Sequence, residues 1–217
     1  MSTRKKFKAT QTVHPAGVAV HPKLDKPYYF DEKLGKSFPD PNAENPRSDL
    51  NITVAYDEAT AAPLIKAIKD YAVEQGFDLE DVKNWPFKKE KDKATGKPTG
   101  RVLFKWKQYA KSLDGDANSV PHYDAKLSKL PKGFKITGGS IVRPKGRILA
   151  FDVGAQTGVR LLLEAIQVIE RRSFEADASG FDATDGYTAE TTSPEDQGEP
   201  DYAAKPEEAA SPNETDF

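Results

Sequence analysis

The chain has 217 residues, and its 32 basic and 34 acidic side chains leave a formal charge of only −2 at pH 7. It contains no cysteine, which excludes a disulfide framework, a thiol nucleophile and a cysteine-ligated zinc site. No stretch approaches the roughly 18–20 apolar residues of a membrane helix. We therefore expect a cytoplasmic protein with no membrane partner.

The near-neutral total hides a strong division of charge along the chain. Residues 174–217 hold thirteen acidic residues and one lysine, and they lack Leu, Ile, Val and Met. Such a segment has too little apolar surface to form a core, so we predict a disordered acidic arm. Residues 1–173 are left with a formal charge of about +10, which predicts one basic domain with a polyanionic partner.

The first third of the domain is predicted to alternate strands with one long loop. Strand-like residues occupy 6–13 and 17–20, and residues 22–46 are crowded with Pro, Asp, Asn, Gly and aromatic residues. That composition is typical of an irregular, functional loop, in which Tyr28 and Phe30 are candidate binding residues. A strand is expected over 49–56, with Leu50, Ile52 and Val54 on one face.

A helix is then predicted from the N-cap Asp57 to Gly76, because apolar residues recur at helical spacing between them. Residues 86–100 are rich in lysine and turn residues, and we expect a flexible loop there. The clearest strand covers 101–109. Its side chains alternate between two faces. One face carries Val102, Phe104 and Trp106, and the other carries Arg101, Lys105, Lys107 and Tyr109.

Two Pro-Lys-Gly triplets, at 131–133 and 144–146, suit turns. The second would join 139–143 to 147–153 as a hairpin. Residues 159–169 fit a helix about as well as a buried strand. These elements favour a small, partly open β-barrel with one inserted helix.

Two clusters combine the residue types that hold single-stranded nucleic acid, which needs cations for phosphates and flat rings for bases. On the 101–109 strand these are Lys105, Lys107 and Tyr109 on one face, with Phe104 and Trp106 favoured as core residues. Around the second triplet, Arg143, Lys145 and Arg147 would form a basic clamp, with Phe151 on the returning strand. The alternative for the strand face is a solvated surface without a ligand, and the alternative for the triplet is a turn that only aids solubility.

Catalytic motifs are sparse. His14, His21 and His122 have no cysteine or clustered carboxylate to complete a metal site, and the 154–158 glycine-rich segment lacks a phosphate-binding lysine. We expect no enzyme activity, no metal and no cofactor.

Several short motifs together resemble those of the single-stranded DNA-binding proteins of T-odd bacteriophages and related tailed phages. Lys6-Phe7 leads into a strand and a Tyr-rich loop, and Asn45-Pro46-Arg47 opens the next strand. Further matches are the alternation of aromatic residues and lysines over 104–110, the Ile-Thr-Gly-Gly-Ser run at 136–140 and the Thr-Gly-Val run at 157–159. The acidic arm closes on Asp216-Phe217.

The resemblance implies an OB-fold, the small Greek-key barrel that binds oligonucleotides, and a strand at 159–169. It implies single-stranded DNA binding in phage replication, recombination and repair, in the host cytoplasm. It assigns DNA contacts to Lys105, Trp106, Lys107 and Tyr109, with a looser match at Phe151. The arm would screen the DNA groove, and Asp216 and Phe217 would contact replication proteins such as DNA polymerase and helicase-primase. A homodimer is also possible.

Two other functional classes remain open on the residues alone. A protein-interaction adaptor would use the arm for recruitment, but it needs no domain with a charge of about +10. An RNA-binding barrel would share the same cations and aromatic residues. A nuclease is the least favoured, for want of a metal-ligand cluster.

Overall fold

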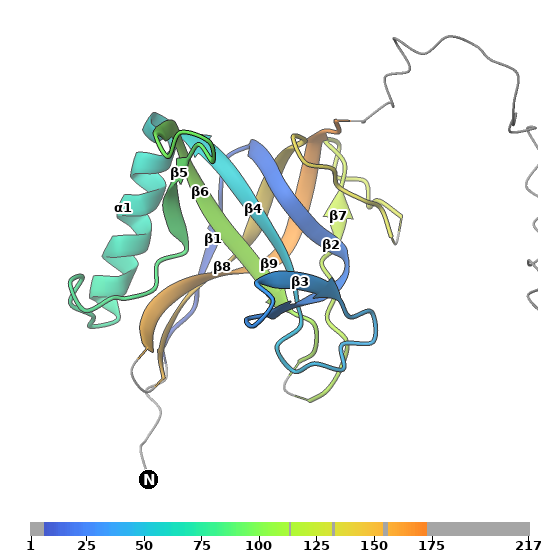
Figure 1. The fold of residues 1–217 in the computed structure, drawn as a ribbon, viewed down its shortest axis with the longest axis horizontal. Helices are drawn as coiled ribbons and strands as arrows, with labels where there is room; N and C mark the ends of the chain where they lie inside the picture. Colours follow the sequence, from blue (N-terminus) through green and yellow to red (C-terminus); the bar gives the residue numbers. More distant parts are fainter. Residues whose placement is uncertain (1–6, 113, 132, 154–155, 173–217) are drawn as a thin grey trace, which may run out of the picture. The chain divides into compact units, whose positions relative to one another are not determined.

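The computed structural model describes residues 7–112, 114–131, 133–153 and 156–172, which form nine strands and one helix (Figure 1). In chain order these are β1 (Thr10–Val13), β2 (Gly17–Asp31), β3 (Lys36–Pro39), β4 (Asp49–Asp57), α1 (Glu58–Glu74), β5 (Phe87–Lys91), β6 (Pro98–Tyr109), β7 (His122–Tyr123), β8 (Ile141–Val153) and β9 (Gln156–Glu170).

The long strands curl into a partly closed barrel. β4 lies antiparallel between β2 and β6, and β9 runs from β6 back to β8. Because β8 pairs antiparallel with β9 and also with the start of β2, the ring returns to its beginning. The contacts β6–β9 and β2–β8 involve only two residue pairs each, so these seams are weakly closed.

The barrel interior is filled by alternate residues of these strands. Ile52 and Val54 from β4 meet Phe104 and Trp106 from β6, and all four side chains are fully buried. Each such side chain contributes about 1.5–3 kcal/mol through burial of apolar surface. The expected separation of the two faces of 101–109 is confirmed. Trp106 is therefore a core residue.

Helix α1 begins and packs as predicted. The Asp57 carboxylate accepts a hydrogen bond from the Thr60 N–H at 2.8 Å, which caps the first turn. Ile68, Tyr71 and Ala72 are buried against the barrel. The Tyr71 hydroxyl accepts from the Ala150 N–H at 3.1 Å and thereby ties the helix to β8.

Two segments predicted as loops contain strands. In 22–46, β2 extends to Asp31 and pairs with β3, so only the following turn-rich part is irregular. Its prolines are tolerated because the β2–β4 register shifts twice, between Val20 and Lys23 and between Lys23 and Tyr28. In 86–100, β5 pairs with β6, so the lysine-rich run begins as an ordered edge strand.

The predicted hairpin at 144–146 is wrong, because β8 runs without interruption through this triplet. Pro144 lacks an N–H, but its carbonyl accepts from the His14 N–H at 3.1 Å. The register against β9 then shifts between Lys145 and Gly146. A bulge thus replaces the expected turn. The ambiguous 159–169 segment is a strand, β9, as the resemblance implied.

The fold class expected from the sequence, a mainly β OB barrel with one helix, is confirmed. The predicted disordered arm at 174–217, with Asp216 and Phe217, lies outside the described residues. Among the residues that the structure describes, no helix is long and apolar enough to cross a membrane.

Candidate functional site

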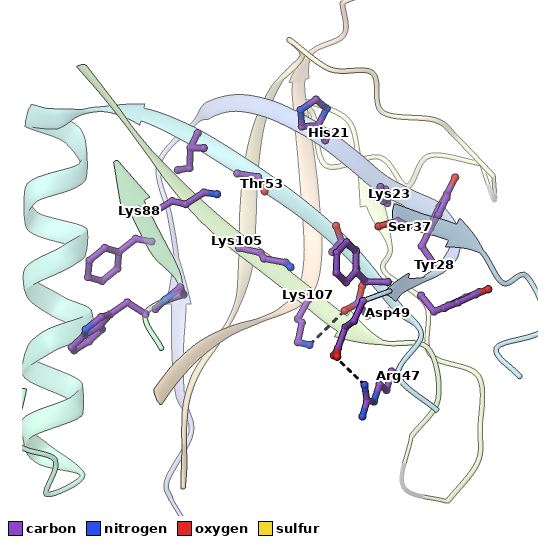
Figure 2. A pocket seen from close by; sticks show the side chains of 18 residues that line it. His21, Lys23, Tyr28, Ser37, Arg47, Asp49, Thr53, Lys88, Lys105 and Lys107 are labelled. Atoms are coloured by element: carbon purple, nitrogen blue, oxygen red, sulfur yellow. Dashed lines mark hydrogen bonds and ion pairs between the residues drawn. The ribbon is translucent and has the colours of Figure 1, made fainter. Parts of the chain in front are cut away.

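A groove crosses the outer face of the barrel over β4 and β6. It consists of two adjoining hollows of about 600 and 550 Å³, which share Trp85, Pro86, Lys105 and Lys107. The first is bounded by the β2–β3 hairpin, as Figure 2 shows, and the second by β8 and β9. We call the two hollows together the groove.

The pleat of β6 explains why lysines reach the groove. Lys105 and Lys107 alternate with the buried Phe104 and Trp106, so both point outward. On β4, Thr53 lies opposite Lys105 and Asn51 opposite Lys107, which gives the groove a polar floor. Figure 2 shows both lysines rising from β6 into the first hollow.

The lining is strongly cationic. Two carboxylates also line it: Glu32 is 3.2 Å from Arg47, and Asp49 is 3.5 Å from Lys107. Partial burial lowers the pKa of Lys23, and repulsion from Lys105 adds to this effect while Asp49 opposes it. The six cationic side chains that line the groove are Lys23, Arg47, Lys88, Lys105, Lys107 and Arg160.

Seven aromatic side chains line the same groove, and six of them lie close to a cation or to another ring. Phe30 is the most open, with 56% of its surface exposed. At the other end, the Arg160 guanidinium lies 4.7 Å from the Phe151 ring centre and donates a hydrogen bond to the Tyr109 hydroxyl. The full set is Tyr28, Tyr29, Phe30, Trp85, Phe87, Tyr109 and Phe151.

Several residues selected from the sequence meet in this groove although they come from separate strands. The structure brings together Lys105, Lys107 and Tyr109 of β6, Tyr28 and Phe30 of β2, and Phe151 of β8. Whether they contact DNA stays a prediction.

Trp106 requires a correction. Its side chain has no exposed surface, and its ring meets that of His14 at 4.7 Å inside the barrel. A base has no access to that ring while the core is intact. The alternation of β6 places the neighbouring lysines outside and Trp106 inside.

The basic clamp also differs from the expectation. Arg143, Lys145 and Arg147 lie on β8 in a continuous strand, not on a hairpin tip, and they do not line the groove. They point outward because Pro144 and Gly146 between them, and Val142 and Ile148 on either side, are buried. Arg147 is also paired with Glu164 at 2.5 Å.

Sequence reasoning did not select seven of the thirteen cationic and aromatic side chains that line the groove. Lys23 lies inside the segment that was predicted to be a loop, and Arg47 directly follows that segment. Trp85 and Phe87 precede or open β5, and Arg160 is on β9. Arg160 could have been predicted to point outward once 159–169 was interpreted as a strand, because it stands between the buried residues Val159 and Leu161. The other residues meet only through tertiary pairing, which no local pattern reports.

Two of the three histidines lie in apolar surroundings. His14 and His122 are buried among aromatic and apolar residues. Within the described part of the chain, no group of three or more His, Cys, Asp or Glu side chains is placed to hold a metal ion.

Comparison with known proteins finds likeness at the level of structure. No protein-family model and no curated protein sequence matches the chain. Gp2.5, a single-stranded DNA-binding protein encoded by bacteriophage T7, is similar with a TM-score of 0.54 and 17% identity, over 84% of this chain and all of that one.

A C-terminally truncated single-stranded DNA-binding protein from bacteriophage Enc34 is similar with a TM-score of 0.55 and 12% identity. The Enc34 protein in complex with single-stranded DNA gives a TM-score of 0.52 and 14% identity. Both comparisons cover 74% of this chain and 86% of the other. At these identities the likeness establishes a shared fold.

Proposed function

We propose that this chain is a sequence-independent single-stranded DNA-binding protein without catalytic activity. The observation that carries the proposal is the groove, in which six cations and seven aromatic rings interleave over β4 and β6. The same fold occurs in the single-stranded DNA-binding proteins of phages T7 and Enc34, and the Enc34 protein has a solved structure in complex with single-stranded DNA.

The two kinds of groove residue match the two parts of a single strand. Cations such as Lys105 and Arg47 attract phosphates, and unstacked bases gain about 1–3 kcal/mol each by stacking on aromatic rings. Every nucleotide offers a phosphate and a ring face, so these contacts do not select a sequence. An adaptor would leave this concentration of charge unexplained.

Competition between matched oligonucleotides tests the proposal. A labelled oligo-dT is displaced by unlabelled oligo-dT or oligo-rU of the same length, while fluorescence anisotropy is followed. We expect oligo-dT to displace the probe at lower concentration than oligo-rU. A better displacement by oligo-rU would favour the RNA-binding alternative, and no binding of either would favour the adaptor.

Single-stranded DNA binding would give the domain a role in phage DNA metabolism and the acidic arm a role in regulating it. Protection of exposed single strands serves phage replication, recombination and repair in the host cytoplasm. The acidic arm at 174–217 would compete with DNA for the basic groove and so screen it when no DNA is bound. Once DNA displaces the arm, Asp216 and Phe217 would be free to recruit a DNA polymerase or helicase-primase. A homodimer would present two such arms.

A further inference from the structure

A row of cations lies outside the groove, on the outward face of β8. Arg143, Lys145 and Arg147 alternate with buried residues, so their side chains share that face at intervals of two residues, which is about 7 Å. Arg143 and Lys145 are exposed, and neither forms an ion pair among the described residues. We call the three side chains the β8 row. It presents two open charges in addition to those of the groove.

The β8 row begins where the groove ends. Phe151 lines the second hollow and stands on the same face of β8, four residues from Arg147, with Leu149 half-buried between them. The pairing of β8 with β9 is regular over this stretch, and Leu149 lies opposite Arg160, which also lines the second hollow. The outward side chains therefore lead from the groove along β8, where β8 and β9 run side by side in the barrel wall (Figure 1).

The neighbours of the β8 row add little opposing charge. One carboxylate lies beside it, that of Glu164 at the bulge of β9, and this group is 2.5 Å from Arg147. Arg147 is therefore partly neutralised, whereas Arg143 and Lys145 are not. The residues that pair with the row are all uncharged: Gln11 and Val13 on β1, and Leu162, Ala165 and Gln167 on β9.

The spacing of the β8 row suits the backbone of an extended single strand. Phe151 and Arg143 lie eight residues apart on β8, a length of about 27 Å. Charges about 7 Å apart match the interval between the phosphates of an extended strand, so this length accommodates about four nucleotides. An acidic surface of a partner protein would also be attracted, but it would not explain why the row starts at the aromatic end of the groove.

We propose that a single strand longer than the groove leaves it past Phe151 and Arg160 and continues along β8, with its phosphates on Lys145 and Arg143. The inference rests on the proposed function. It gives β8 a part in setting how many nucleotides one domain occupies. Because the row adds phosphate contacts, it lengthens the binding site without selecting a sequence.

The length of the oligonucleotide tests this extension. Oligo-dT of increasing length, bracketing the about 4–16 nucleotides that one OB barrel occupies, is titrated against wild type and Arg143→Ala/Lys145→Ala. The variant should match wild type on short oligomers and bind long ones several-fold more weakly. On long oligomers its slope of log K against log salt should fall by about 1.4, the value of two phosphate contacts.

A second double variant controls for charge alone. Lys69→Ala/Lys93→Ala removes the same charge from exposed positions that do not line the groove. It should bind oligo-dT of every length as wild type does.

Glu164→Gln provides a gain of affinity, which misfolding cannot produce. The change releases Arg147 from its ion pair, so long oligomers should bind several-fold more tightly while short ones bind as before. The matched control is Asp70→Asn, which removes the same charge and releases Lys66 on α1 from an ion pair of 2.6 Å. It should not tighten binding of either.

The outcomes separate the two proposals. Wild-type affinity of Arg143→Ala/Lys145→Ala at every length would overturn the extension along β8. An equal loss on short and long oligomers, or the same loss in Lys69→Ala/Lys93→Ala, would overturn it too, because the row would then act only through general attraction. In these cases the groove proposal stands. No binding of oligo-dT of any length by wild-type protein would overturn both.

Discussion

Lys105 and Lys107 lie two residues apart on β6, yet their surroundings differ. Lys107 is held at 3.5 Å from Asp49 and lies over the Tyr109 ring, whereas Lys105 is exposed and has no ion pair among the described residues. A phosphate reaching Lys107 must compete with a carboxylate already in place. Of the two β6 lysines, Lys105 is therefore the one whose charge is more available to a phosphate.

Replacing Lys105 should weaken DNA binding and its dependence on salt. We expect Lys105→Ala to lower affinity for oligo-dT several-fold at low salt and to reduce the slope of log K against log salt by about 0.7, the value of one phosphate contact on a single strand. Titrations at four salt concentrations measure both quantities. Lys69→Ala, an exposed lysine on α1, is the matched control, and an equal effect there would contradict the assignment.

His14 makes stability depend on pH. It is 2% exposed, its Nδ1 has no hydrogen-bond partner in the described part of the chain, and burial lowers its pKa to about 4. The unfolded chain binds a proton near pH 6.5, whereas the folded protein resists it. Protonation of His14 in the unfolded chain therefore destabilises the folded protein as the pH falls from about 6.5 toward 4, and it has little effect above pH 6.5.

Between pH 7 and pH 5, His14 should account for a loss of about 2 kcal/mol in the free energy of unfolding. Urea unfolding at the two pH values, compared between wild type and His14→Phe, isolates this contribution because the variant keeps a ring in the core. His21→Phe, at an exposed histidine, should leave the pH dependence unchanged. A His14→Phe protein with the full wild-type dependence would exclude this role.

At the scale of elements, Gly146 permits the bulge that replaced the predicted hairpin. A Cβ atom there would lie 1.8 Å from the Leu162 carbonyl oxygen and 3.1 Å from the Trp106 ring. Gly146→Ala must push β8 away from β9, and overpacking of this kind costs about 1–3 kcal/mol or more. Thermal unfolding measures the loss.

Gly138→Ala provides the matched comparison, because a Cβ atom at that position meets nothing within 4 Å. We expect its melting temperature to stay near that of wild type. If Gly146→Ala were as stable as Gly138→Ala, β8 and β9 would not approach each other as closely as described.

The strands predicted most clearly from sequence, β4 and β6, alternate regularly, whereas β2 and β8, which were predicted only in part, pair with register shifts. In β4 and β6 the burial of every second residue produces a visible period of two. In β2 and β8, register shifts admit Pro22, Pro27 and Pro144, and these residues suggest turns in a local reading. The pairing partners that tolerate them are distant in sequence.

Groove residues could be predicted from the sequence where they share one regular strand, and not where pairing of distant strands brings them together. Lys105, Lys107 and Tyr109 share one alternating strand, so their common face was predictable. Arg47 precedes β4 and Trp85 precedes β5, and both reach the groove because these two strands pair with β6. Trp106 was named as a contact through the resemblance, although the strand pattern favoured it as a core residue, and the pleat does direct it into the core.

At the scale of the whole molecule, the balance between a basic domain and an acidic arm is itself testable. Deleting residues 174–217 removes about −12 of formal charge and should tighten DNA binding at low salt, because a tethered competitor is lost. The gain should shrink as salt rises. Binding curves for full-length and truncated protein at low and moderate salt measure it, and unchanged affinity would mean that the arm does not screen the groove.

Tryptophan fluorescence tests most directly whether the groove over β4 and β6 binds single-stranded DNA. Of the two tryptophans, Trp106 is buried in the core and Trp85 lines the groove, so intrinsic fluorescence reports on groove occupancy. Titration with oligo-dT at low and high salt should give a saturable change in Trp85 fluorescence, with an affinity that falls steeply as salt rises. Unchanged fluorescence at low salt, with no complex detected by sedimentation, would contradict the account.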